Sequence, residues 1–423
     1  MRLRSKDPAA DHRKLIHARL VWFIIIVAFL AALSLAIIHR GDRISGLRDD
    51  AAAYAGLAEN LLRKHSFELH SRSELFWVPG YPAFLALIFL VAGRSALAVY
   101  AVQAALLAAT LFLVYKIALH VTQNEAASLL ALALCALWYP FYKSVPTVLT
   151  ETLGGFLTAA AMWRLLLAIK RPRPWTCLAA GALLALAAFT KALIVFYVVV
   201  AVIMVALSSK DRIRAIRVAV LIGIGAAVLL APWTVRNYAV SGKFVPVSTA
   251  GPPNFWLGNN PRNYEVLPRH LHLGKMLANV PPAEMERYYY RQGWTFIRED
   301  PLRATKIFWM KFAELWLGRL GGPLCHYDEP QPTIGSFAIP RLAMLSVPLF
   351  LLAILGWVVS PRPDKVRAYP ILALLILWTT GYVALISQTR YVLPVQFYEI
   401  VFAAVGARWL VHALLSRTRL SSS

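Results

Sequence analysis

The chain is poor in charged residues and in cysteine. Only 15% of its 423 residues are charged, whereas roughly a quarter of the residues of an average soluble domain are charged. Its hydrophobic residues make up 59%, which excludes an ordinary soluble fold. Of the three cysteines, Cys135 and Cys177 lie in apolar runs and Cys325 has no obvious partner. The sequence therefore predicts neither disulfides nor thiolate metal sites.

Several motifs of well-known enzymes are missing. There is no Gly-rich phosphate loop, no His and Cys spacing typical of a metal site and no G-x-S-x-G elbow. ATP-driven work and serine hydrolysis are therefore unsupported. Acidic residues are also scarce, with 21 Asp and Glu against 44 Lys and Arg. This positive charge does not indicate a nucleic-acid partner, because the basic residues cluster in short loops between apolar runs.

What the chain has instead is long apolar runs. Residues 20–38 supply the roughly 20 apolar residues that cross about 30 Å of hydrocarbon, and no small-x-small cleavage site follows them. We predict an all-α polytopic membrane protein with about ten transmembrane helices, outer juxtamembrane helices and a mixed extracytoplasmic segment. The predicted spans lie near 20–39, 96–119, 126–142, 147–169, 176–190, 192–207, 218–232, 342–359, 370–386 and 394–414.

The basic loops assign the two sides of the membrane. With ten spans, the basic loops fall on the cytoplasmic side, as short basic loops should. These are the N-terminal segment, KRPRP, KDRIRAIR, RPDKVR and the C-terminal tail. The run 176–207 is basic at both ends, so it must fold back and place FTKA (189–192) outside. The run 81–92 is too short to span, and we interpret it as a helix lying on the outer membrane–water boundary.

This topology divides the chain into three parts. An N-terminal transmembrane module (1–232) contains the first outer loop (40–95), an extracytoplasmic segment follows (233–341), and the C-terminal transmembrane helices come last (342–423). Most acidic residues lie in the two outer parts. We therefore expect the chemistry on that side of the membrane.

The first candidate residues are two adjacent aspartates. The segment 49–64 has helical apolar spacing, with Asp49 and Asp50 in its first turn and Tyr54 at i+4 from Asp50. Either aspartate can cap the helix. One carboxylate suffices as a cap, and the other, at a low-dielectric boundary, can act as a general base.

Other candidates lie at the outer ends of the spans. Glu151 lies about one turn inside its span, where an acidic residue is costly and indicates either function or contact with water. Lys191, Arg236 and Arg390 lie at the outer boundary, where the positive-inside rule does not place positive charge. Each could simply reach lipid headgroups, but as a set they fit a pocket for a lipid-linked phosphate.

The residues resemble those of a family, the polytopic C-type glycosyltransferases that use polyprenyl-phosphate sugars. This family includes bacterial relatives of the dolichyl-phosphate-mannose protein mannosyltransferases and the aminoarabinose transferases of lipid A. The resemblance runs through most of the chain. It rests on Asp50 and Tyr54, PGYPAFLALIFLVAG (79–93), LTETL (149–153), FTKA (189–192), PWTVRNYAVSGKFVPVSTAGPPNFWLGNNP (232–261) and TRYVLPV (389–395).

The resemblance implies an inverting hexosyl or pentosyl transferase that moves a sugar from a polyprenyl-phosphate carrier to an acceptor hydroxyl of a glycan, lipid or protein. It implies a location in the bacterial cytoplasmic (inner) membrane, with the site facing the periplasm or exterior. Asp50 would be the base, Asp49 an alternative to it, and Glu151 a second acidic residue of the catalytic site. Lys191, Arg236 and Arg390 would bind the donor phosphate, and a substrate pocket would comprise Tyr54, Tyr81, Asn237 and Tyr391.

No cofactor is required for this chemistry. A divalent metal is compatible with it but unsupported, because the second outer segment lacks a DxD or ExD triplet. Two other classes stay open. A multispan transporter or lipid flippase would place ionisable residues near the bilayer midplane, and a scaffold of envelope assembly would leave the acidic pair incidental.

Overall fold

In the computed structural model, helices dominate the described residues, which are 8–39, 47, 49–69, 72–207, 211–260, 284–318 and 338–420. The bundle helices are α1 (Pro8–His39), α4 (Ala96–Thr122), α5 (Glu125–Leu137), α6 (Tyr139–Ser144), α7 (Glu151–Lys170), α8 (Pro174–Ala188), α9 (Ile194–Leu207), α10 (Arg212–Ser241), α15 (Ala338–Val359), α16 (Arg362–Ala384) and α17 (Leu393–Leu420). A 3₁₀ turn, η1 (Thr389–Val392), precedes α17.

The predicted all-α membrane fold is confirmed. Each of the ten predicted spans falls largely on helices, and among the described residues six helices are long and apolar enough to cross a membrane. The other four spans fall on the shorter apolar helices α5, α8, α9 and the described part of α15. The run 81–92 forms α3 (Gly80–Ala92), a helix of 13 residues.

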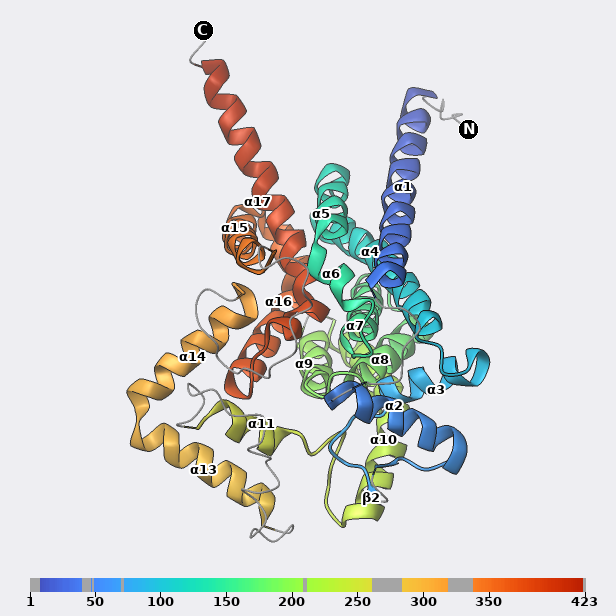
Figure 1. Cartoon of the computed structure of the whole chain (residues 1–423). Helices are drawn as coiled ribbons and strands as arrows, with labels where there is room; N and C mark the ends of the chain where they lie inside the picture. Colours follow the sequence, from blue (N-terminus) through green and yellow to red (C-terminus); the bar gives the residue numbers. More distant parts are fainter. Residues whose placement is uncertain are drawn as a thin grey trace.

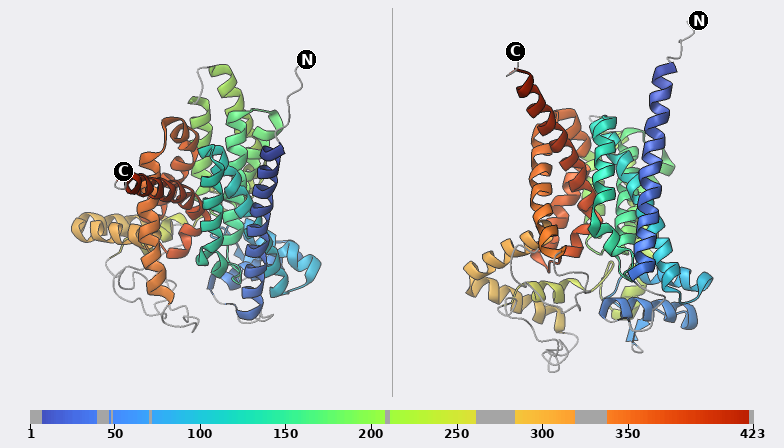
Figure 2. Two further views of the ribbon diagram at one scale, coloured as in Figure 1. Left: turned by 90° about the horizontal axis from the view of Figure 1, so that it is seen from above. Right: turned by 45° about the horizontal axis from the view of Figure 1, so that its top comes forward.

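The remaining elements gather at one end of the bundle. They are α2 (Asp49–Lys64), α11 (Gly251–Gly258), α13 (Met285–Glu299), α14 (Pro301–Trp316) and a short antiparallel pair, β1 (Glu68–Leu69) with β2 (Arg72–Ser73). The start of α1 and the end of α17 lie at the opposite end (Figures 1 and 2). The described parts of the two predicted outer segments therefore lie mainly at the same end of the bundle.

Two predicted spans differ in detail from the helices. The span 126–142 is broken, because α5 ends at Leu137, Trp138 is extended and α6 begins anew at Tyr139. Pro140 fits the start of α6, where the backbone N–H that proline lacks has no intrahelical acceptor. The span 218–232 continues to Ser241, past Pro232, so that Arg236 and Asn237 lie in the last turns of α10.

A close contact joins α3 to the turn after α8. The Gly80 N–H donates to the Phe189 carbonyl at 2.7 Å, and a Cβ at residue 80 would lie 2.5 Å from that oxygen. Real Cβ atoms do not approach a backbone oxygen so closely, so only glycine fits. The contact fixes the turn that carries Lys191 against the start of α3.

Gly80→Ala is expected to destabilise the fold by about 1–3 kcal/mol, the usual cost of overpacking, and to displace the turn 189–191. The measurement is thermal unfolding in detergent. Gly223→Ala is the matched control, because a Cβ at Gly223 in α10 would meet no atom within 4 Å. Equal melting temperatures for the two variants would contradict the expectation.

Candidate active site

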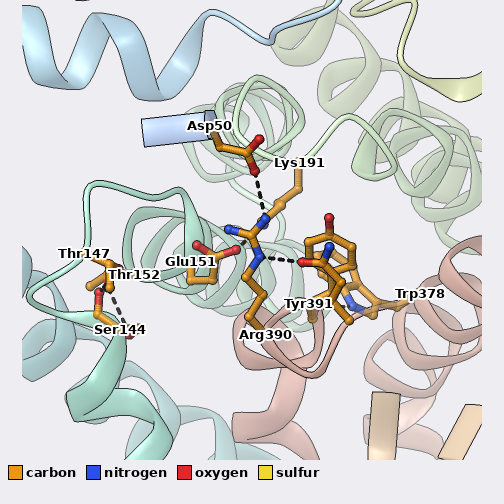
Figure 3. A network of polar contacts seen from close by, with 10 residues as sticks. Asp50, Ser144, Thr147, Glu151, Thr152, Lys191, Trp378, Arg390 and Tyr391 are labelled. Carbon is orange, nitrogen blue, oxygen red and sulfur yellow. Dashed lines mark hydrogen bonds and ion pairs between the residues drawn. The ribbon is translucent and has the colours of Figure 1, made fainter. Parts of the chain in front are cut away.

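The first polar pair of the site joins α2 to η1, the turn before the last helix. Asp50 lies in the first turn of α2, and its Oδ2 accepts from Arg390 Nη2 at 2.8 Å (Figure 3). Gln388 orients the same guanidinium, because its Oε1 accepts from Arg390 Nε at 2.8 Å. The Asp50 side chain is 35% exposed and that of Arg390 25%. The carboxylate thus remains accessible while an arginine holds it in place.

A second pair lies beside the first and is buried. Lys191 Nζ lies 3.1 Å from Glu151 Oε1, and the two residues are only 6% and 4% exposed. Glu151 is the first residue of α7, and Lys191 lies in the turn after α8. Burial lowers the pKa of Lys191, while Glu151 beside it acts in the opposite direction. The ion pair therefore offsets part of the cost of burying the ammonium.

Aromatic rings surround the two pairs. The Tyr391 ring centroid lies 5.4 Å from Lys191 Nζ and 5.3 Å from Arg390 Cζ, within the range of a cation–π contact. Trp378 fixes this tyrosine by donating from Nε1 to its carbonyl at 2.9 Å. One aromatic residue thus links both cations of the site.

The predicted pocket residues Tyr54 and Tyr81 belong to an aromatic group beside Asp50. The Tyr54 ring packs edge-on against Trp77 and Tyr81, with centroids 5.1 and 5.2 Å apart. Burial raises the pKa of Tyr54 well above its usual value, and the charge of Asp50 raises it further. Tyr54 therefore stays a neutral phenol. Tyr81 donates to Gln103 Oε1 at 2.9 Å.

Arg236 and Asn237 have different partners from the other predicted site residues. Arg236 donates to the carbonyls of Glu74 at 2.6 Å and Phe67 at 3.0 Å, and Asn237 is fully buried and donates to the Val245 carbonyl at 3.0 Å. Within the described ranges, no hydrogen bond or ion pair joins either residue to the two charged pairs. Shared depth in the membrane did not bring Arg236 to Lys191 and Arg390.

Arg236→Met is expected to lower the free energy of unfolding by about 2 kcal/mol, because it removes charge-assisted bonds to two carbonyls. Hydrogen exchange in residues 67–76 should rise, while binding of decaprenyl phosphate should stay unchanged. Lys243→Met is the control, since Lys243 is exposed just beyond the same helix. A selective loss of phosphate binding in Arg236→Met would instead support the sequence prediction for this residue.

A small cavity adjoins the buried pair. Its volume is about 10 Å³, the room that one water molecule needs, and its polar lining is Thr110, Ser144, Glu151 and Thr152. Glu151 Oε2 has no hydrogen-bond partner among the described residues. The cavity is therefore too small to hold anything larger than a water molecule.

Some residues of the site were not predicted. Gln388, Trp378 and Gln103 are not among the residues that the sequence predicted for the site. A polar residue in an apolar run, such as Gln103 in α4, is a usable signal, and so is Glu399, which is buried in α17. The helix start at Asp49 matches the prediction, and the Asp49 side chain lies outside the described part. No three His, Cys, Asp or Glu of that part lie close enough to hold a metal ion.

The comparisons with known proteins agree with the resemblance predicted from the sequence. Residues 78–235 match a family described as dolichyl-phosphate-mannose-protein mannosyltransferase. No curated protein is significantly similar in sequence. The matched region contains Glu151 and Lys191 but neither Asp50 nor Arg390.

Two solved structures share the fold. One is the oligosaccharyltransferase AglB of Archaeoglobus fulgidus in complex with an inhibitory peptide and a dolichol-phosphate, with a TM-score of 0.54, 14% identity, and coverage of 97% of this chain and 52% of AglB. The other is the A. fulgidus oligosaccharyltransferase tethered to an acceptor peptide, with a TM-score of 0.56, 14% identity, and coverage of 93% and 50%. The chain thus spans about half the length of these proteins.

Proposed function

We propose that this chain, which shares the fold of a C-type polytopic glycosyltransferase, is an inverting glycosyltransferase that takes a single hexose or pentose from a polyprenyl-phosphate carrier. The acceptor is a hydroxyl of a glycan, a lipid or a protein. The observation that carries the proposal is the meeting of Asp50, Glu151, Lys191 and Arg390, which four distant segments bring to one end of the membrane bundle. We place this end at the periplasmic or exterior face.

Asp50 is the base in this proposal. Its carboxylate is partly exposed and oriented by Arg390, so it can accept a proton from an acceptor hydroxyl that arrives from the aqueous side. The hydroxyl oxygen attacks the anomeric carbon, the bond from that carbon to the phosphate oxygen breaks, and the configuration inverts. The phosphate leaves with the bonding electron pair.

Arg390 and Lys191 stabilise the leaving phosphate. A guanidinium has five N–H donors, of which Asp50 and Gln388 take one each, so Arg390 can bind phosphate and base together. Preorganised cations of this kind can contribute several kcal/mol to transition-state stability. Glu151 offsets part of the cost of burying the Lys191 ammonium. Arg236 is left out of the phosphate site, because its bonds tie it to the first outer loop.

The location of the charges favours a transferase over a transporter. Transporters place their ionisable residues near the midplane, whereas the described ion pairs of this site lie at one end of the bundle. Glu399 lies apart from these pairs and is buried in the first two turns of α17.

The test uses membranes that contain the chain and a panel of decaprenyl-phosphate hexoses and pentoses with labelled sugars. We expect the label of one donor to move into a glycan, lipid or protein fraction, and no movement in membranes without the chain. If intact labelled donor or free sugar crosses the membrane without transfer, the chain is a transporter and the proposed transferase is wrong.

A further inference from the structure

Lys311 lies on α14, outside the charged site, and is only 4% exposed. Its ammonium donates to three oxygens, the Gly258 carbonyl at 3.1 Å, Asn259 Oδ1 at 3.2 Å and the Leu385 carbonyl at 3.2 Å. Gly258 ends α11 and Leu385 is the residue that caps α16. Carbonyls at helix C-termini carry partial negative charge, which favours a cation between them.

The same turn is held by other contacts. Asn259 Nδ2 donates to the Ala384 carbonyl at 2.8 Å. A Cβ at Gly258 would lie 1.6 Å from the Leu385 oxygen, so the end of α11 packs directly against the end of α16. Trp316, also on α14, donates from Nε1 to Thr379 Oγ1 at 3.1 Å. The helices α11 and α14 are thus both fastened to the last turns of α16.

The fastened turn leads directly to the charged site. Leu385 is five residues before Arg390, and Ile386 and Ser387 between them are 6% and 3% exposed. Gln388 follows and orients the Arg390 guanidinium. Because this connection is short and packed, a change in the Leu385 carbonyl position is transmitted to Arg390.

We infer that Lys311 is a positioning residue: its ammonium holds the turn 384–388 and thereby sets the place of Arg390 beside Asp50. The consequence for donor binding rests on the proposed function, whereas the effect on the turn does not. Tyr391, which contacts both site cations, depends on the same turn. The extramembrane helices α11 and α14 therefore act on the charged site without contributing a group that touches the phosphate.

The experiment compares Lys311→Met, Arg390→Ala and the double variant as purified full chains in detergent. The first readout is hydrogen exchange in residues 384–391, which should rise in Lys311→Met. The second is the dissociation constant for decaprenyl phosphate, which we expect to rise about tenfold in Lys311→Met, equivalent to about 1.4 kcal/mol. If Lys311 acts through Arg390, the double variant should bind no more weakly than Arg390→Ala alone.

Lys306→Met is the matched control, because Lys306 is an exposed lysine of the same helix. It should leave exchange and binding as in the wild type. If Lys311→Met does not insert, Asn259→Ala tests the same turn by removing the bond to Ala384 and an acceptor of Lys311.

The inference is wrong if hydrogen exchange in residues 384–391 is unchanged in Lys311→Met. It is also wrong if the fold-losses in affinity of the two single variants multiply in the double variant, because independent effects combine in that way. Normal phosphate binding by Arg390→Ala counts against the proposed function instead, and the exchange result then decides on Lys311 alone. These outcomes separate the failure of the positioning role from the failure of the phosphate site.

Discussion

Asp50→Asn is expected to reduce sugar transfer by about 10²–10⁴-fold, the contribution of a positioned general base. Asparagine has nearly the same size as aspartate, and its amide oxygen can still accept from Arg390 Nη2, which lies 2.8 Å from the carboxylate in the wild type. The amide cannot take the acceptor proton. The variant should therefore insert, melt and bind decaprenyl phosphate much as the wild type does, while turnover collapses.

The measurement is the initial rate of transfer from the labelled donor, with the binding of decaprenyl phosphate measured separately. Glu59→Gln is the matched control. Glu59 lies on the same helix and also pairs with an arginine, with its Oε1 2.7 Å from Arg94 Nη2, but it is outside the charged site. A rate for Asp50→Asn within threefold of this control would remove Asp50 as the base.

Sequence-based predictions match the structure best where they depend only on residues close together in the chain. The helix α2 begins and ends where the spacing of apolar residues and the first-turn aspartates indicate. Apolar runs and loop charges likewise predict which segments lie at which end, because both depend on the membrane and not on particular partners. The break at Trp138 was missed because the apolar run continues through it, so hydropathy alone does not report it.

The site was predictable only in part. The sequence indicates how deep a residue lies in the membrane, but not where it lies around the bundle. Lys191, Arg236 and Arg390 were all predicted to follow spans at the outer boundary, and the sequence gives no information on how the helices are arranged around the bundle. Packing decides that Lys191 and Arg390 lie beside one aromatic ring, while Arg236 stacks on Trp233 and Phe67. Gln388 acts by orienting the Arg390 guanidinium, and a single sequence contains no pattern that reveals such a contact.

Lys191→Met is expected to destabilise the fold by roughly 3–5 kcal/mol, because it leaves the buried carboxylate of Glu151 without its cation. Loss of transfer in this variant alone would not distinguish a structural role of Lys191 from a role in donor binding. The double variant Lys191→Met/Glu151→Met separates the two. It replaces both charges by apolar side chains of similar size, and such replacements of buried pairs are often neutral or stabilising.

The double variant should therefore regain most of the wild-type melting temperature but not the affinity for decaprenyl phosphate, which we expect to remain at least about tenfold weaker because the ammonium is gone. Arg94→Met is the control for breaking an ion pair as such. Its partner Glu59 is partly exposed, so the loss should be under about 1 kcal/mol, with binding unchanged. If the double variant recovers both stability and phosphate binding, Lys191 serves the fold only, and Arg390 is left as the cation that the donor must meet. Comparing the single and double variants thus shows whether the Lys191 charge serves donor binding or only the stability of the fold.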